Sequence, residues 1–236
     1  MNRRYLAFDI ETAKILPEQV ADLLSHRPLG IVCAAAVDIA DPQQETLWHG
    51  KESGKPSPKM SRGEAQALVR DLGRFVADGY TLLTWNGLGF DFNVLAEESG
   101  LPAECAPLAL AHVDMMFHVV CNLGHFLGLD KVAHGMGLRG KPQGMSGHRA
   151  PVLWASGHQA EVLQYAAGDC RITAEVARAA EERGAIEWLT ARGSRATMAL
   201  PKGWLTAEQA MALPFPDTSW MRNPPSRESF TSWIRR

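Results

Sequence analysis

Two acidic residues stand two positions apart near the start of the chain. The segment Phe-Asp-Ile-Glu-Thr at residues 8–12 has the pattern of a strand end. Because successive strand side chains point to opposite faces, Asp9 and Glu11 share one face of that strand. Two neighbouring carboxylates repel each other unless a positive charge lies between them, which suggests a divalent cation. The alternative is a solvent-facing strand end followed by a helix that Thr12 caps.

Two later stretches each place an acid beside an aromatic residue. Asp91 follows Trp-Asn-Gly-Leu-Gly-Phe at residues 85–90 and opens a predicted helix. Its alternative role is simply to cap that helix. Tyr165 and Asp169 are four residues apart on another predicted helix, so they project from the same face. The alternative there is a buried tyrosine above an exposed acid.

Taken in order, the three stretches resemble the exonuclease motifs of the DEDD superfamily. They are Phe-Asp-Ile-Glu-Thr at 8–12, Asn-x-x-x-Phe-Asp at 86–91 and Tyr-x-x-x-Asp at 165–169. The tyrosine is typical of the DEDDy branch, because the histidine variant would need His where Gln164 stands. The first motif is similar to proofreading exonuclease domains of family B DNA polymerases. The resemblance covers about residues 4–183, and with no polymerase domain following we expect a stand-alone exonuclease.

The resemblance implies an α/β fold of the ribonuclease H-like type, a mixed five-stranded sheet flanked by helices. It also implies that Asp9 bridges two divalent ions, that Glu11 and Asp169 complete the first ion's site, and that Asp91 holds the second through a water. Tyr165 would orient the attacking water. Hard carboxylate oxygens suit Mg²⁺ or Mn²⁺ rather than zinc. Two such ions ~4 Å apart activate a water and stabilise the leaving 3′ oxygen.

Residues that flank the motifs are candidates for substrate contact. Thr12 closes the first motif, and Asn86, Leu88 and Phe90 belong to the second. An apolar side chain there could stack on the terminal bases or wedge against them. Core packing is the alternative for Phe90.

A glycine-rich stretch at residues 137–150 precedes the third motif, and we expect it to form a loop. Long loops inside compact domains are usually functional or disordered. Within it, His148 and Arg149 are candidates for contacts with substrate phosphates. The histidines as a whole match no metal-binding spacing, so we expect structural or surface roles for them.

Alternating strand and helix signals place these motifs in an α/β sheet. We expect strands at residues 5–10, 31–37, 46–49 and 81–85, and a polar loop at 51–59. Ser61 and Glu64 form a predicted capping box for a helix that ends at Gly79. Further helices are expected at 91–99, 115–127, after Asp130, and at 159–183.

The chain beyond Gly184 is predicted to be a small C-terminal extension. We expect an exonuclease domain over residues 1–184 and, over 185–236, a hairpin and short helices packed on the core. The hairpin is placed at 186–190 and 195–200, and the helices at 206–213 and 226–234. Five aromatic residues are expected to pack this extension onto the core, namely Trp204, Phe215, Trp220, Phe230 and Trp233.

The composition is that of an ordinary globular protein, with 236 residues, 46% hydrophobic and 21% charged, and a net charge of −2. The slightly negative net charge excludes a protein that binds nucleic acid through a broad basic surface. The four cysteines form no CxxC pair, which favours reduced thiols in the cytoplasm. No signal peptide or membrane span is evident.

We therefore expect a metal-dependent 3′–5′ exonuclease that acts on single-stranded DNA 3′ ends and releases 5′-mononucleotides. An exoribonuclease with the same site is the alternative, since no reader of the 2′-hydroxyl is evident. A catalytically inactive nucleic-acid-binding or docking module is the alternative from another class. Two bound divalent ions would add four positive charges and offset the four acids. Removal of the ions by a chelator is therefore expected to abolish substrate binding as well as catalysis.

Overall fold

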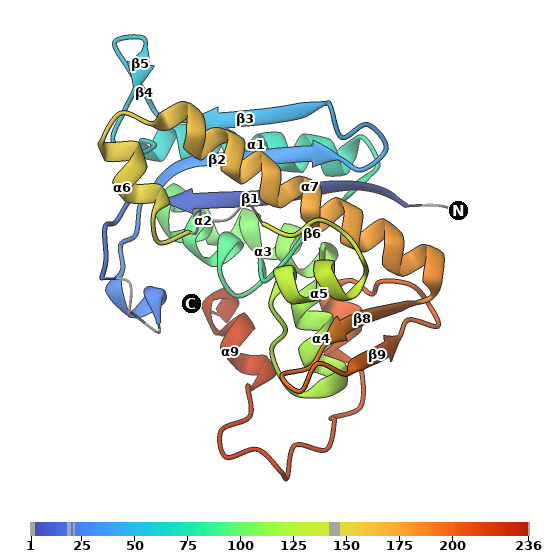
Figure 1. The fold of residues 1–236 in the computed structure, drawn as a ribbon. Helices are drawn as coiled ribbons and strands as arrows, with labels where there is room; N and C mark the ends of the chain where they lie inside the picture. Colours follow the sequence, from blue (N-terminus) through green and yellow to red (C-terminus); the bar gives the residue numbers. More distant parts are fainter. Residues whose placement is uncertain (1–2, 18–19, 21, 142–146, 236) are drawn as a thin grey trace.

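The computed structural model describes residues 3–17, 20, 22–141 and 147–235 (Figure 1). Its centre is a five-stranded sheet in the order β3-β2-β1-β6-β7. These strands are β1 (Arg4–Thr12), β2 (Ile31–Asp38), β3 (Glu45–His49), β6 (Tyr80–Thr84) and β7 (Val113–Asp114). The pairs β1–β2 and β2–β3 are antiparallel, whereas β1–β6 and β6–β7 are parallel. The sheet is therefore mixed, as expected.

Both faces of the sheet are covered, which explains the nearly continuous apolar run of β2. Helices α1 (Arg62–Ala77), α2 (Asp91–Ser99) and α3 (Pro102–Ala111) lie on one face, and α7 (Gln159–Arg183) crosses the other (Figure 1). Small residues of β2, such as Ala35, face small residues of α7, such as Ala166 and Cys170. The helix therefore packs close to the sheet.

Several helices begin and end where local signals predict. The Ser61 side chain accepts the Glu64 amide and Glu64 accepts the Ser61 amide, so the capping box of α1 is formed. Helices α2 and α7 end at Gly100 and Gly184, which both have left-handed backbone conformations. Such conformations favour glycine because it carries no Cβ.

Other elements differ from the prediction. The helix expected over 115–127 is α4 (Met115–Leu123), and it ends early because Gly124 turns with a φ of 74°. Helix α5 (Leu129–Gly135) follows, as expected after Asp130. The loop expected at 51–59 contains a short hairpin of β4 (Lys51–Glu52) and β5 (Lys55–Pro56). Helix α3 was not predicted, because Pro107 lies inside it. Nor were β7, η1 (Leu23–His26) and α6 (Ala150–Ala155).

The glycine-rich stretch forms a loop only in part, because α6 begins at its last residue. Residues 142–146 of that stretch lie outside the described residues. No helix within the described ranges is long and apolar enough to cross a bilayer.

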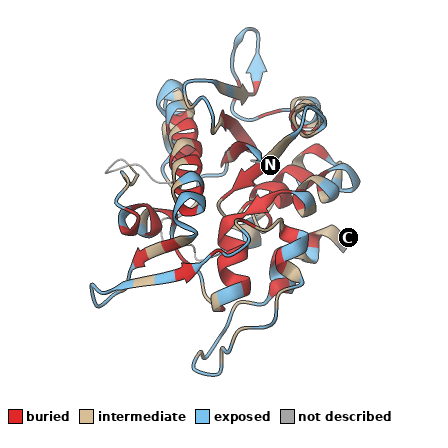
Figure 2. Cartoon of the chain, turned by 90° about the vertical axis from the view of Figure 1, so that its right-hand side faces the viewer, coloured by how far each residue is buried: buried red, intermediate tan, exposed pale blue. Residues whose placement is uncertain are grey.

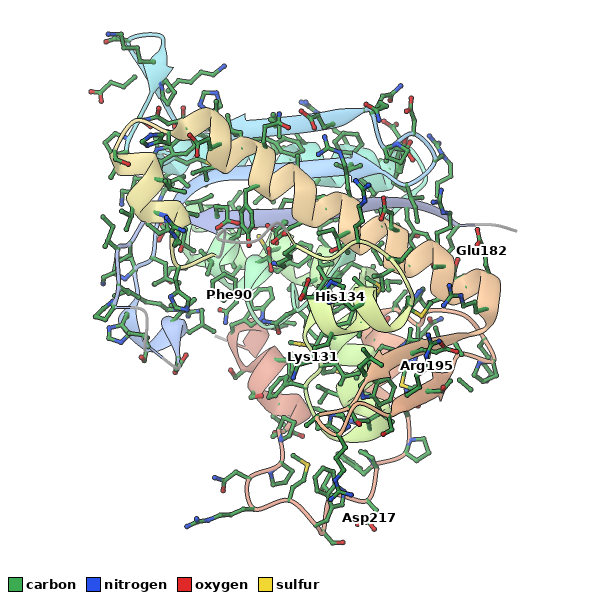
Figure 3. All side chains as sticks on the ribbon, viewed as in Figure 1. Phe90, Lys131, His134, Glu182, Arg195 and Asp217 are labelled. Atoms are coloured by element: carbon green, nitrogen blue, oxygen red, sulfur yellow. The ribbon has the colours of Figure 1, made fainter. Side chains whose placement is uncertain are left out.

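The C-terminal segment contains β8 (Ala185–Leu189), β9 (Arg195–Ala199), α8 (Ala207–Met211), α9 (Arg227–Thr231) and η2 (Ser232–Arg235). Three of its aromatic residues, Trp204, Phe230 and Trp233, are buried against the rest of the fold, and Figure 2 shows how the buried residues are distributed. Phe215 and Trp220 are 78% and 68% exposed, so the prediction that they pack on the core was wrong. They lie on the long connection around Asp217, which protrudes from the molecule (Figure 3).

Candidate active site

The first two acids lie on the central strand of the sheet. Alternation along β1 directs Phe8 and Ile10 into the core shared with α1 and α2. Asp9 and Glu11 therefore point to the opposite face, which α7 covers. Burial on this face is incomplete at Asp9, whereas Glu11 is only 6% exposed.

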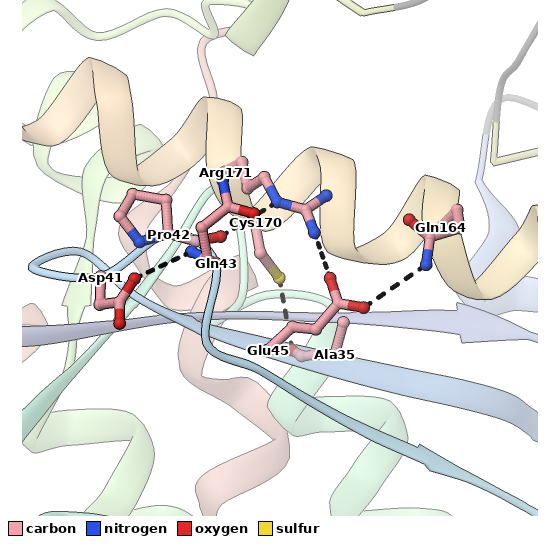
Figure 4. Close-up of polar contacts among 8 residues, drawn as sticks. All are labelled: Ala35, Asp41, Pro42, Gln43, Glu45, Gln164, Cys170 and Arg171. Atoms are coloured by element: carbon pink, nitrogen blue, oxygen red, sulfur yellow. Dashed lines mark hydrogen bonds and ion pairs between the residues drawn. The ribbon is translucent and has the colours of Figure 1, made fainter.

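Helix α7 brings Tyr165 and Asp169 to the same place from the other layer. Its register over the sheet is held in part by contacts of Cys170 and Arg171 (Figure 4). The Cys170 thiol donates to the Ala35 carbonyl at 3.3 Å, and the Arg171 guanidinium donates to the Pro42 carbonyl at 3.3 Å. Arg171 also forms an ion pair with Glu45 of β3. These contacts come from the two residues after Asp169 and so fix which face of α7 meets β1.

The fourth acid, Asp91, is the first residue of α2 and not its N-cap, which is Phe90. Its Oδ1 accepts the backbone N–H of Ile10 at 3.0 Å, which ties α2 directly to β1 between the two acids of that strand. The loop before it is tight, because a Cβ on Gly87 would lie 2.4 Å from the hydroxyl of Thr84.

A buried acid that the sequence reasoning missed, Asp114, holds this loop. Its carboxylate accepts the backbone N–H groups of Asn86 and Leu88, each at 2.9 Å. It is 1% exposed, and burial raises its pKa to about 6. Asn86 has a φ of 75°, which is uncommon for a residue other than glycine. Asp114 thus acts on the site through the loop, and its charge also contributes to raising the pKa of Asp91.

Oxygens of Asp9, Glu11 and Asp169 lie within 4.8 Å of one another. Burial and mutual repulsion raise the pKa values of Asp9 and Glu11 well above their usual range. Burial also raises the pKa of Asp91 to about 7, although the hydrogen bond from Ile10 opposes this shift. Asp91, the fourth acid singled out in the sequence, lies next to this group of three, because its Oδ1 accepts the N–H of Ile10, the residue between Asp9 and Glu11.

One carboxylate oxygen of Asp169 stays without a hydrogen bond from the described residues, although Lys141 pairs with the other. The Oδ1 of Asp169 is buried and has no hydrogen-bond partner among the described residues. An ionised carboxylate oxygen buried without a partner is costly. Three hard oxygen donors and this orphaned atom fit a divalent cation such as Mg²⁺ or Mn²⁺. The residues present therefore fit the metal that the sequence predicted, without identifying the ion.

A cationic side chain, Lys141, also reaches the cluster. Its ammonium group pairs with Asp169 and lies 3.2 Å from the Tyr165 hydroxyl. Burial lowers the pKa of Lys141, but attraction to Asp169 and the neighbouring acids outweighs this effect and the pKa is raised. The loop is placed by Asp130, whose carboxylate accepts the Lys141 backbone N–H at 2.8 Å. In the sequence, the only hint of this role is that residues 111–150, which include Lys141, contain four basic residues and two acidic ones.

Replacing Lys141 with methionine is expected to tighten Mn²⁺ binding and to destabilise the metal-free protein. The reason is that Lys141 partly neutralises the same carboxylates that would hold the ion. Calorimetric titration with Mn²⁺ and thermal unfolding in chelator measure the two effects. Lys131→Met, on the outer side of α5 (Figure 3), is the matched control. Unchanged or weaker Mn²⁺ binding by Lys141→Met would contradict this expectation.

Only some of the residues predicted to contact substrate lie beside the acids. Asn86 and Phe90 line hollows beside the acids, and Thr12 is half-buried at the end of β1. Leu88 is fully buried in the core, so the expectation that its side chain touches substrate does not fit its position. His148 and Arg149 lie in a turn just before α6, and their contact with substrate phosphates stays a prediction.

The histidines form no metal-binding cluster within the described part of the chain. His112 and His118 are buried, and burial lowers the pKa of each to about 4. His134 lies at the surface of α5, 3.5 Å from Asp130 (Figure 3). These positions fit structural and surface roles.

A model of the RNase_H superfamily matches residues 46–180, more than half of the chain, and the chain therefore belongs to this superfamily. The fold is also similar to the family B DNA polymerase of the hyperthermophilic archaeon Pyrobaculum calidifontis. The TM-score is 0.57 at 20% identity, over 77% of this chain and 25% of the polymerase. Exonuclease I aligns with a TM-score of 0.40 at 14% identity, over 77% of this chain and 41% of that protein. No curated protein sequence matches. The resemblance to family B polymerases is thus confirmed at the level of the fold.

Proposed function

We propose that this chain is a metal-dependent 3′–5′ exonuclease that shortens single-stranded DNA and releases 5′-mononucleotides. The observation that carries the proposal is the gathering of Asp9, Glu11 and Asp169 around a buried carboxylate oxygen that lacks a partner among the described residues. Membership of the RNase_H superfamily and the fold shared with a DNA polymerase support it. The chain spans only a quarter of that polymerase, and polymerase activity is not proposed for it.

In this proposal the acids have distinct roles. Asp9, Glu11 and Asp169 would hold one divalent ion, and Asp9 with Asp91 a second. When bound, such ions lower the pKa of a water and stabilise the charge of the leaving 3′ oxygen. The hydrogen bond from the Ile10 N–H fixes Asp91 to β1 and orients one of its carboxylate oxygens. The charge of Asp91 also interacts with that of Asp169.

Tyr165 is suited to orient a water and not to act as a base. Burial raises its pKa above its usual value of 10, and the neighbouring acids raise it further, so the hydroxyl stays protonated at neutral pH. A neutral hydroxyl donates one hydrogen bond and accepts others. Its oxygen already contacts Lys141 at 3.2 Å, beside the acid cluster.

Tyr165→Phe is expected to lower kcat by roughly 10²-fold, the typical effect of removing one oriented hydrogen-bonding group. Mn²⁺ affinity is expected to change little, because the variant keeps the three clustered carboxylates and the Tyr165 hydroxyl, whose pKa is raised, carries no charge. Single-turnover hydrolysis of an oligonucleotide and Mn²⁺ titration measure the two quantities. Tyr80→Phe, whose hydroxyl bonds Asp38 at the far end of the sheet, is the control. Full activity of the Tyr165→Phe variant would show that the Tyr165 hydroxyl has no role in catalysis.

The function itself is tested with a 5′-labelled DNA oligonucleotide in Mg²⁺ or Mn²⁺. A descending ladder of products is expected, and it should disappear in chelator. A 3′-labelled strand should release its label at once as a mononucleotide. Failure to shorten DNA in either metal would overturn the proposal. A matched RNA strand that is degraded faster than the DNA would instead assign an exoribonuclease.

A further inference from the structure

A second hollow adjoins the acid cluster. The first, of about 610 Å³, contains Asp9, Lys141 and Asp169. The second, of about 520 Å³, is lined by residues around Phe90 and by the C-terminal helix α9. Asn86 and Phe126 line both hollows, so the two meet at these side chains. A group held in the first hollow can therefore extend directly into the second.

Phe126 is an unusual side chain for its position. It lies between α4 and α5 and is 55% exposed, although it is a large aromatic residue. Its ring is 5.9 Å from the ring of Phe230 and tilted by 36°. Phe230 thus supports Phe126 on one side, while more than half of Phe126 remains open to solvent.

The C-terminal segment is firmly fixed where it forms this hollow. Arg227 donates to the carbonyls of Cys121 at 3.0 Å and of Pro214 at 2.7 Å. The Trp233 indole donates to the Leu88 carbonyl at 2.8 Å, directly on the second motif. Phe230 is 4% exposed and packs so closely on Gly89 that a Cβ there would lie 3.0 Å from its ring.

The chemistry of the second hollow suits a flat, uncharged group. Phe90, Phe126 and Phe230 supply its aromatic walls, and Ser229 lies beside them. Among its described lining residues the only charged one is Asp22, which would repel a phosphate. Every nucleobase offers a π-face that stacks on aromatic side chains without sequence preference.

We propose that Phe126, Phe90 and the C-terminal residues Ser229 and Phe230 form a nucleobase slot beside the acid cluster. It takes a base that flanks the scissile phosphate. This inference rests on the proposed function, because that function places the scissile phosphate at the acids. The C-terminal segment then forms part of the substrate groove, and its role goes beyond covering the core.

The test compares binding of two DNA oligonucleotides in Ca²⁺ by fluorescence anisotropy, one intact and one abasic at its last two positions. Wild type is expected to bind the intact strand about tenfold more tightly, in line with stacking of one base. Phe126→Leu should bind the intact strand as weakly as the abasic one, with abasic binding unchanged. Trp220→Leu, at an aromatic residue that is 68% exposed and lines neither hollow, is the control and should behave as wild type. If the Phe126→Leu variant binds the intact strand as tightly as wild type does, the proposed nucleobase slot is refuted.

A second pair of variants tests the C-terminal wall. Ser229 and Ser232 are both exposed, but only Ser229 lines the hollow. Ser229→Trp should fill the slot and remove the preference for the intact strand, whereas Ser232→Trp should keep it. Equal behaviour of the two variants would exclude the C-terminal segment from the slot.

The two proposals fail in different ways. Hydrolysis of DNA without any preference for the intact strand would overturn the slot and leave the exonuclease assignment standing. A base preference that depends on Phe126, with no hydrolysis in Mg²⁺ or Mn²⁺, would overturn the exonuclease and keep a nucleobase-binding site. Absence of binding to both strands, together with no hydrolysis in Mg²⁺ or Mn²⁺, overturns both.

Discussion

Asp9→Asn is expected to abolish exonuclease activity while making the metal-free protein more stable. Asp9 lies at the centre of the four acids, and the three others and its own burial all disfavour its charge. The amide keeps the shape of the side chain and removes that charge. In the proposed function Asp9 would bind both ions, and loss of its charge would remove several kcal/mol of transition-state stabilisation, so a fall of about 10³-fold or more in rate is expected.

The opposite signs of the two effects make this prediction specific. A variant that had merely misfolded would lose both activity and stability. Thermal unfolding in chelator is expected to show a rise of the order of 1 kcal/mol, since a raised carboxyl pKa means that its charge opposes folding. Asp41→Asn, at an exposed turn between β2 and β3, serves as the control. Wild-type activity in Asp9→Asn with Mn²⁺ would refute the assigned site.

Asp91→Asn is expected to become steadily more stable than the wild type as pH rises from about 5 to 8 in chelator. In the folded chain the pKa of Asp91 is about 7, against its usual 3.8. The folded state therefore retains a proton that the unfolded state has released. The protonated Asp91 therefore contributes its full stabilisation of the folded state below about pH 4, and this stabilisation is lost as pH rises through 7. The amide side chain of the variant never carries the charge and keeps an oxygen that can accept from the Ile10 N–H.

The difference between variant and wild type is the quantity to measure. His112 and His118 also make stability depend on pH, because burial lowers the pKa of each to about 4 and their contribution to stability grows as pH rises to 6.5. Both proteins contain these histidines, so this contribution cancels when the two stabilities are subtracted. A pKa of about 7 in place of 3.8 corresponds to roughly 4 kcal/mol at most at alkaline pH. Adding Mn²⁺ should stabilise the wild type more at pH 8 than at pH 5, because the ion needs ionised ligands. A difference that does not change with pH would contradict the prediction.

The sequence predicted the elements that carry the acids because their signals are local. The alternation of β1 follows from the period of a strand, and α7 has the predicted bounds because Gly184 ends it. The ordered spacing of the acids then pointed to the fold. These features depend on residues within a few positions of one another.

The groups that the sequence did not reveal are positioned by distant contacts. Lys141 reaches the acids because Asp130 holds its loop, and no periodicity marks that pairing. Phe126 gains its place from Phe230, more than a hundred residues away. Leu88 was expected to contact substrate but is buried in the core, and the Trp233 indole donates to its carbonyl. Long-range packing of this kind leaves no local pattern.

The acids proposed to share one cation come from both ends of the domain, and this has a consequence for synthesis. Asp9 and Glu11 emerge from the ribosome first, but Asp169 lies on the last helix to cover the sheet. A chain that has been made only as far as β7 contains the sheet and no third ligand. The growing chain, surrounded by ribosomal and messenger RNA, therefore lacks the complete proposed metal site until α7 has been made and has docked.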